Sequence, residues 1–390
     1  MQHTPDTLDL LDTLISFDTT SANSNLNLIH WVRDLLGAVG AAVSVIANSD
    51  NTKANLYATI GPNEKPGILL SGHTDVVPVQ GQKWTSSPFA MAVKNGRAYG
   101  RGTTDMKGFI ACALRMFLRA STHQLETPLH LALSYDEEIG CVGVHSLLDM
   151  LSQAPFTPLI CIVGEPTELQ VAIGHKGKTA CHVTCTGRAA HSSLAPQAMN
   201  AIHLATDLIN RIRQLQNRLR ETGARDEDYD VPYTTLHVSN IYGGVALNIV
   251  PDHCQFDMEI RNLAEDNPEQ LLDSIKYDAQ KITTEAQKHA KEANIELQLF
   301  NSYPGLDTRV DESVVNFVQS LTQSTGSIKV AFGTEAGLFS NRLRIPSVVC
   351  GPGSMQQGHK ADEFISLDQL AQCDAMLGRL LTCLEQGITH

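Results

Sequence analysis

The segment PGILLSGHTD, residues 66–75, joins an apolar run to a His-Thr-Asp triplet. The apolar part is typical of a buried strand, and similar runs occur at residues 129–135 and 158–163. Helical patterns lie between these runs, at residues 107–120 and 144–152. Strands that alternate with helices indicate βαβ units, so we expect an α/β fold with a mostly parallel central sheet.

The middle of the chain has a different order of elements. We expect strands at residues 179–187, 233–241, 254–261 and 295–300, with helices at residues 195–219 and 268–290. This βαββαβ order is typical of a ferredoxin-like sandwich. A final strand at 345–350 and a C-terminal helix at 367–385 then return to the first pattern. We therefore predict a larger domain of residues 1–178 and 300–390, interrupted by an inserted domain at 179–299.

The overall charge excludes several classes of partner. Lys and Arg number 29 against 42 Asp and Glu, which gives a net charge of −13. Such a chain has no cationic excess for nucleic-acid phosphates or an anionic membrane. No apolar run reaches the roughly 18–20 residues that span a bilayer, and residues 1–20 resemble an amphipathic helix rather than a secretory signal. Nine cysteines without a CxxC pair indicate reduced thiols and a cytoplasmic protein.

Side chains that bind metals follow the predicted strands. In chain order they are His73, Asp75, Asp105, Glu137, Glu138, Glu165 and His359. Because ligand crevices in open α/β sheets lie at the carboxyl ends of strands, we expect these residues to meet at one edge. Imidazoles with carboxylates suit zinc, cobalt or manganese better than calcium. The spacing of His73 and Asp75 allows the carboxylate to accept the second ring N–H, and one carboxylate of the Glu137–Glu138 pair could act as a general base.

Seven ordered motifs carry a resemblance to the M20 family of dinuclear metallohydrolases. They are LLSGHTDVVPV, YGRGTTDMKG, SYDEEIG, VGEPT, GRAAHSS, GGVALNIVPD and GPGSMQQGHKADEF. The resemblance extends from about residue 8 to residue 385. It implies a zinc-peptidase-like catalytic domain, residues 1–178 and 300–390, and a lid and dimerisation domain at 179–299.

The resemblance also implies a role for each candidate residue. Two divalent ions, Zn²⁺ or Co²⁺, would be held by His73, Asp105 and Glu165 and by Asp105, Glu138 and His359. Glu137 would be the general base, and Asp75 would orient His73. Lys107 begins a helix, and the alternative of a purely structural charge remains open for it.

Residues of the inserted domain would complete the site. His191 resembles a family histidine that reaches across from a neighbouring subunit and donates to the developing oxyanion, which implies a homodimer through the lid. Asn248 and Arg261 match substrate-contacting positions, and Arg261 suits a carboxylate, although a surface ion pair remains an alternative. Lys176 is a further candidate for the same anionic end of the substrate.

The GTEAG segment at residues 333–337 resembles the acetylornithine deacetylase branch of the family more than its desuccinylase branch. The resemblance implies hydrolysis of an N-acyl amino acid, with N²-acetyl-L-ornithine yielding L-ornithine and acetate. Glu335 could contact the substrate ammonium or could be a structural acid. The alternatives are a succinyl-diaminopimelate desuccinylase, an aminoacylase-like amidase, and a non-catalytic binding protein on the same fold.

Overall fold

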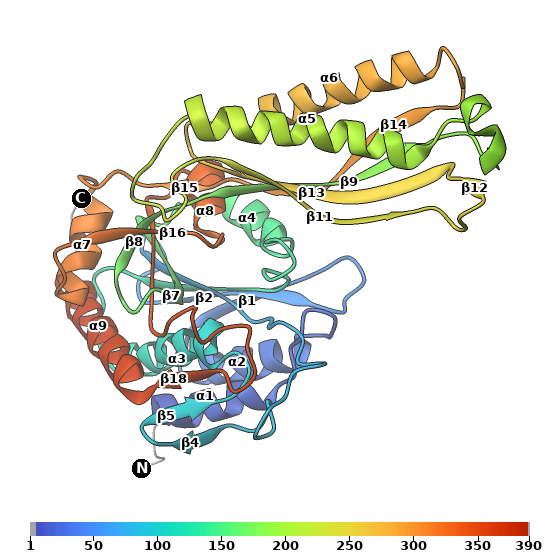
Figure 1. The fold of residues 1–390 in the computed structure, drawn as a ribbon. Helices are drawn as coiled ribbons and strands as arrows, with labels where there is room; N and C mark the ends of the chain where they lie inside the picture. The colour runs from blue at the N-terminus through green and yellow to red at the C-terminus, as the bar shows by residue number, and fades with distance from the viewer. Residues whose placement is uncertain (1–4, 389–390) are drawn as a thin grey trace. The chain divides into compact units, whose positions relative to one another are not determined.

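The computed structural model describes residues 5–388, which form two compact units (Figure 1). The first unit contains the chain up to Gly174, the segment Leu306–Lys329 and the chain from Thr334 onward. The second unit contains His175–Gly305 and Val330–Gly333. In residues 5–388, no helix is both long and apolar enough to cross a membrane.

A mixed nine-stranded sheet forms the centre of the first unit. Its strands pair in the order β1-β2-β6-β3-β7-β17-β8-β15, and β16 pairs with β8. The four central strands β6, β3, β7 and β17 are parallel. Their bounds are Leu129–Ser134, Ile68–His73, Ile160–Pro166 and Ser347–Gly351. The outer strands are β1 (Ala42–Ala47), β2 (Ala54–Ile60), β8 (Val171–His175), β15 (Leu306–Asp307) and β16 (Ser327–Val330).

Helices cover both faces of this sheet (Figure 1). One layer contains α1 (Thr7–Ser16), α2 (Leu26–Ala38), α3 (Gly108–Ala120) and α9 (Leu367–Gln386). The other face carries α4 (Val144–Ser152) and α8 (Ala336–Leu343), which contact each other. The helix α7 (Ser313–Thr322) packs on α9 and β17, and a small sheet joins β4 (Ala92–Lys94), β5 (Arg97–Tyr99) and β18 (Phe364–Ser366).

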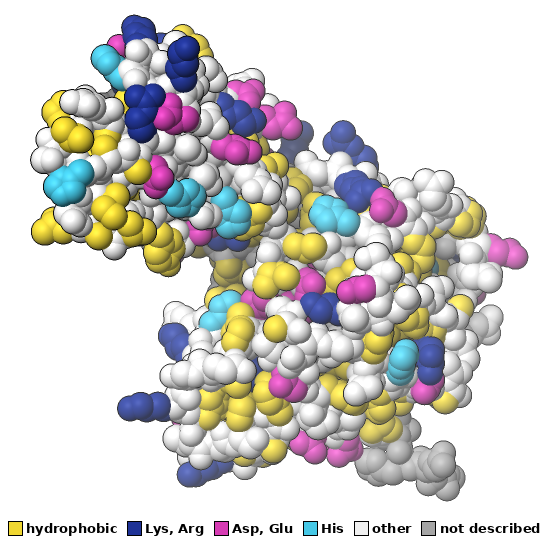
Figure 2. Space-filling view, turned by 90° about the vertical axis from the view of Figure 1, so that its right-hand side faces the viewer, with side chains coloured by type: hydrophobic (Ala, Val, Ile, Leu, Met, Phe, Trp, Pro, Cys, Tyr) yellow, Lys and Arg dark blue, Asp and Glu magenta, His cyan; other side chains and the backbone are white. Residues whose placement is uncertain are grey.

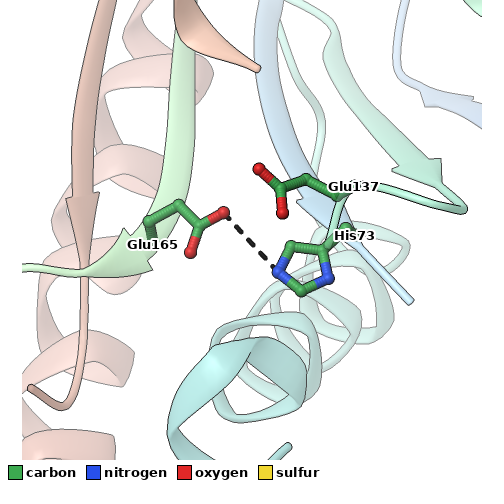
Figure 3. A group of neighbouring side chains, drawn as sticks. All are labelled: His73, Glu137 and Glu165. Carbon is green, nitrogen blue, oxygen red and sulfur yellow. Dashed lines mark ion pairs between the residues drawn. The ribbon is translucent and has the colours of Figure 1, made fainter. Parts of the chain in front are cut away.

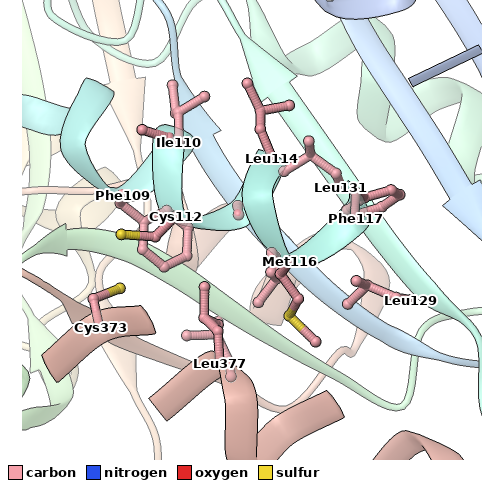
Figure 4. Packing of buried hydrophobic residues seen from close by; sticks show 14 of the residues in the cluster. Phe109, Ile110, Cys112, Leu114, Met116, Phe117, Leu129, Leu131, Cys373 and Leu377 are labelled. Atoms are coloured by element: carbon pink, nitrogen blue, oxygen red, sulfur yellow. The ribbon is translucent and has the colours of Figure 1, made fainter. Parts of the chain in front are cut away.

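The core of the first unit lies between this helical layer and the central strands (Figure 4). Phe109 and Phe117 of α3 are buried, and Leu129 and Leu131 of β6 face the same cluster. Gly164 on β7 shows how tight this packing is, because a Cβ there would lie 2.0 Å from the ring of Phe109.

The second unit is an antiparallel sheet with two helices on one face (Figure 1). Its strands pair in the order β11-β13-β9-β14, which is the ferredoxin-like order. The strands are β9 (Gly177–Thr186), β11 (Thr235–Gly243), β13 (His253–Asn262) and β14 (Asn294–Tyr303), and the helices are α5 (Ala201–Thr222) and α6 (Pro268–Ala286). Two short strands, β10 (Ala190–His191) and β12 (Ile249–Val250), pair separately. This unit exposes several large hydrophobic side chains, among them Tyr242, Val245 and Leu247, and Figure 2 shows hydrophobic and histidine side chains at the surface.

The α/β fold class predicted from the sequence is confirmed. One helix begins later than predicted. A short 3-10 helix at Ser192–Gln197 precedes α5, which starts at Ala201 rather than Ala195. The reason is local: Pro196 lies in the 3-10 turn, and the side chain of Asn200 caps α5 by accepting two backbone N–H groups.

Candidate metal centre

Several site residues come from the carboxyl ends of parallel strands, as expected from the sheet topology. His73 is the last residue of β3, and Glu165 lies near the end of β7. Glu137 and Glu138 follow β6, and Asp105 precedes α3. Neighbouring parallel strands end at the same edge of the sheet, so segments far apart in sequence meet there.

Two groups of these residues have ligand atoms within 4.8 Å of one another. The first group is His73, Glu137 and Glu165, shown in Figure 3. The second group is His73, Asp105 and Glu138. His73 Nε2 lies 3.0 Å from Asp105 Oδ1 and 3.6 Å from Glu165 Oε1. His73 thus contacts both Asp105 and Glu165, while the group that contains Glu165 includes Glu137 rather than Asp105.

His359 approaches the other side of Asp105. Its Nε2 atom lies 3.1 Å from Asp105 Oδ2 and 3.1 Å from Glu138 Oε2. Each carboxylate oxygen of Asp105 therefore faces one imidazole. Hydrogen bonds to Asp105 and Glu138 raise the pKa of His359 to about 10. Burial opposes ionisation of Asp105, but hydrogen bonds to His359 and His73 hold its pKa well below the usual value.

Burial disfavours the charged forms of the remaining carboxyl groups. Burial, and then the charge of Asp105, raises the pKa of Glu165 well above its usual value. Burial raises the pKa of Glu137 in the same direction, and it raises the pKa of Glu138 to about 7. These buried oxygens and two imidazoles form the mixed N/O donor set that zinc and cobalt accept. The residues present therefore fit a divalent metal centre.

Asp75 connects His73 to the glutamate loop. His73 Nδ1 lies 2.9 Å from the main-chain oxygen of Asp75 and 3.6 Å from its carboxylate. The carboxylate instead accepts hydrogen bonds from Ser21 Oγ at 2.7 Å and from the N–H groups of Glu137 and Glu138 at 3.0 and 3.2 Å. The orientation of His73 thus rests mainly on a backbone carbonyl, while the Asp75 side chain fixes the loop that follows β6.

The candidate residues of the second unit are His191, Asn248, Arg261 and Lys176, and the side chains of three of them contact other residues of that unit. His191 is exposed, and its Nδ1 lies 2.8 Å from Ser193 Oγ. Asn248 is exposed, and Arg261 contacts Glu259 at 3.2 Å and the hydroxyl of Tyr303 at 3.2 Å. Lys176 is buried and donates to the main-chain oxygens of Val231 and Tyr233 at 2.7 and 2.5 Å.

Two buried ionisable residues lie beside the centre in the first unit. Glu335 is 1% exposed, its Oε1 has no hydrogen-bond partner, and burial raises its pKa to about 7. Lys107 is fully buried and donates to the main-chain oxygens of Leu14 and Phe17 at 3.0 and 2.9 Å. Through these two hydrogen bonds Lys107 holds the C-terminal end of α1.

The sequence reasoning missed the buried pair of Arg101 and Glu363. Both residues stand inside quoted motifs, YGRGTTDMKG and GPGSMQQGHKADEF, close to a predicted ligand. Arg101 Nη1 donates to Glu363 Oε2 at 2.7 Å. A charged residue four positions from a predicted ligand was the available signal, but its partner is 262 residues away in sequence.

Comparison with known proteins agrees with the fold and the donor set. Residues 69–382 match Peptidase family M20/M25/M40. The chain belongs to this family. It is 34% identical over 381 residues to an acetylornithine deacetylase of Myxococcus xanthus, covering 95% of each chain, and 31% identical to one of Proteus mirabilis, covering 93% of this chain and 91% of the relative.

Solved structures of the family share the fold. A metallo-carboxypeptidase from Sulfolobus solfataricus has a TM-score of 0.78 at 19% identity and covers 98% of this chain and 100% of its own. A tripeptidase from Staphylococcus aureus has a TM-score of 0.76 at 20% identity and covers 98% of both chains. The protein is thus an M20 metallohydrolase with grouped His, Asp and Glu side chains that can bind metal.

Proposed function

We propose that this M20 metallohydrolase cleaves the amide bond of an N-acyl amino acid, with N²-acetyl-L-ornithine as substrate and L-ornithine and acetate as products. The observation that carries the proposal is 30–34% identity over at least 90% of this chain to relatives named acetylornithine deacetylase. The donor set described above supports the metal-dependent part of the proposal.

In this proposal His73, Asp105 and Glu165 would hold one divalent ion, Zn²⁺ or Co²⁺, and Asp105, Glu138 and His359 would hold the other. When bound, such ions would supply Lewis-acid chemistry to an acyl carbonyl and to water. The short contacts of Asp105 to both histidines, 3.0 and 3.1 Å, support its assignment as the bridge.

Glu137 serves as the general base. Its carboxyl group lies near His73 and Glu165. Asp105 also contacts His73, so Asp105 can be the ligand there and Glu137 can remain free to accept a proton. Burial raises its pKa well above the usual value, which suits a group that takes a proton from water and then returns it to the leaving nitrogen. Asp75 holds this loop in place through the N–H groups of Glu137 and Glu138.

We assign the inserted domain, residues 179–299, as a lid and dimerisation domain. His191 of a second copy would donate to the oxyanion, while Asn248, Arg261 and Lys176 would contact substrate. Arg261 already pairs with Glu259, so binding of a substrate carboxylate would require an exchange of partners. The unpartnered Oε1 of Glu335 supports a contact with the substrate ammonium, which the buried carboxyl would accept in its ionised form.

The test is a substrate panel with and without a chelator. Purified protein loaded with Zn²⁺ or Co²⁺ should release acetate from N²-acetyl-L-ornithine faster than it releases succinate from N-succinyl-diaminopimelate or acyl groups from N-acetylmethionine. Preference for one of the other two substrates would replace the assignment with a desuccinylase or an aminoacylase-like amidase. Absence of metal binding and of turnover on all three would favour a binding protein.

Two variants separate the proposed roles. Glu137→Gln should retain both metal ions and lose about 10²–10⁴-fold in kcat. Glu335→Gln should raise KM for N²-acetyl-L-ornithine while leaving KM for an uncharged N-acetyl amino acid unchanged. Full turnover in the first variant would contradict the general base, and an unchanged KM in the second would contradict the ammonium contact.

A further inference from the structure

Arg101 and Glu363 form an ion pair that is almost completely inaccessible to solvent. Each residue is 1% exposed, and the Nη1–Oε2 distance is 2.7 Å. Burying two charges costs several kcal/mol per ion, so a pair of this kind contributes little net stability. Its position beside the metal centre therefore needs another explanation.

The carboxylate of Glu363 holds the main chain of the bridging ligand. Its Oε1 atom accepts hydrogen bonds from the N–H groups of Thr104 at 2.9 Å and Asp105 at 3.2 Å. Its main-chain oxygen also accepts from the N–H of Gly100 at 3.0 Å. The turn that presents Asp105 is thus fixed to Glu363 at both ends.

The guanidinium of Arg101 holds the main chain of the second histidine ligand. Its Nη2 donates to Gln82 Oε1 at 2.5 Å, and Gln82 Nε2 donates to the main-chain oxygen of His359 at 3.1 Å. Arg101 Nη1 also lies 3.4 Å from the main-chain oxygen of Lys360. The planar guanidinium group of Arg101 therefore joins Glu363 to the loop that carries His359.

We propose that the buried pair of Arg101 and Glu363 positions Asp105 and His359 and thereby sets the affinity for the ion that these two ligands share. The inference rests on the metallohydrolase function proposed above, and it concerns ligand placement. Asp105 Oδ2 and His359 Nε2 are 3.1 Å apart but belong to segments more than 250 residues apart in sequence. The pair contacts the main chain of both segments, so it fixes the gap into which the ion must fit. Such supporting contacts are typically worth about 10–100-fold in metal affinity.

The network has two arms: Arg101 contacts His359 through Gln82, and Glu363 accepts the N–H of Asp105. Two variants test these arms, and a third is the control. Gln82→Leu breaks the arm to His359 and changes a half-buried residue; it also removes the hydrogen bond that Gln82 Oε1 accepts from Trp84 Nε1. Glu363→Gln weakens the arm to Asp105. Arg115→Met is the matched control, because it removes a salt bridge to Asp374 between α3 and α9 of the same unit. Circular dichroism of each metal-free protein checks the fold.

Metal-free protein is titrated with Co²⁺. Calorimetry measures the affinity, and the visible absorption of the bound ion reports its coordination. The wild type and Arg115→Met should bind two equivalents with the same affinities and spectra. Gln82→Leu and Glu363→Gln should weaken one equivalent about tenfold or more and shift its spectrum.

The outcomes separate this inference from the proposed function. If Gln82→Leu binds both equivalents like the wild type, the positioning role is wrong, whether or not Glu363→Gln folds. If Arg115→Met weakens binding equally, a general loss of stability explains the result and the inference also fails. If the wild type binds no Co²⁺ at all, the metallohydrolase proposal itself is overturned.

Discussion

His130 gives a quantitative prediction for the stability of the first unit. It lies on β6, the strand that leads to the glutamate loop, and its ring is stacked on Tyr57 with 5.5 Å between centroids. Its Nδ1 lies 2.9 Å from Thr59 Oγ1. Burial lowers the pKa of His130 to about 4 from a usual value of 6.5.

The folded and unfolded states bind the His130 proton differently, and this difference makes the stability depend on pH. Between pH 6.5 and about 4, the unfolded chain binds the His130 proton and the folded chain does not. The free energy of unfolding therefore falls as the pH falls through this window, by about 1.4 kcal/mol per pH unit. The full contribution is about 3 kcal/mol, and about 2 kcal/mol of it is lost between pH 7 and pH 5.

The assay is urea unfolding of His130→Gln and the wild type at pH 7 and pH 5. Both tryptophans, Trp31 and Trp84, belong to the first unit, so tryptophan fluorescence follows the unfolding of that unit. The wild type should lose about 2 kcal/mol more than the variant between the two pH values. His30→Gln, a change of an exposed histidine in the same unit, is the control and should behave like the wild type. Parallel losses in wild type and His130→Gln would refute the reasoning.

Three further outcomes are expected. Chelation should lower the Tm by about 5–10 °C, since an ion at 100 times its Kd adds about 2.7 kcal/mol, and added Zn²⁺ should restore it in calorimetry. Gly164→Ala should cost about 1–3 kcal/mol in urea unfolding, because its Cβ would lie 2.0 Å from the Phe109 ring; wild-type stability would contradict that packing. Lys107→Met should cost about 1–3 kcal/mol by removing the donor that the oxygens of Leu14 and Phe17 share, while Co²⁺ affinity stays unchanged; a loss of metal would contradict a structural role.

Local patterns predicted the elements that position the site. The helix expected at residues 144–152 is α4 with the same bounds, and the buried strands were found to within a few residues. The approach of His73 and Glu165 could also be predicted, because parallel strands bring their carboxyl ends to one edge. These conclusions need only apolar runs and the order of elements.

Features that depend on tertiary packing could not be predicted in this way. Gly164 next to Glu165 has the pattern of a turn, whereas the structure places it inside β7 against the ring of Phe109. The pairing of Arg101 with Glu363 joins residues 262 positions apart, and no periodicity encodes it. Single-sequence reasoning identifies which side chains can bind a metal, but it does not identify the residues that hold their main chains.

The same centre accounts for part of the acidic balance of the chain. Burial raises the pKa of Glu137, Glu138 and Glu165, which means that the metal-free fold disfavours their charged forms. A metal ligand must be deprotonated, so ion binding by Glu138 and Glu165 works against the protonated forms that burial favours. Two divalent ions would reduce a net charge of −13 to about −9 when every carboxylate is ionised. The cluster is therefore costly to the empty fold and favourable only with its cations, as expected for a site selected for chemistry rather than for stability.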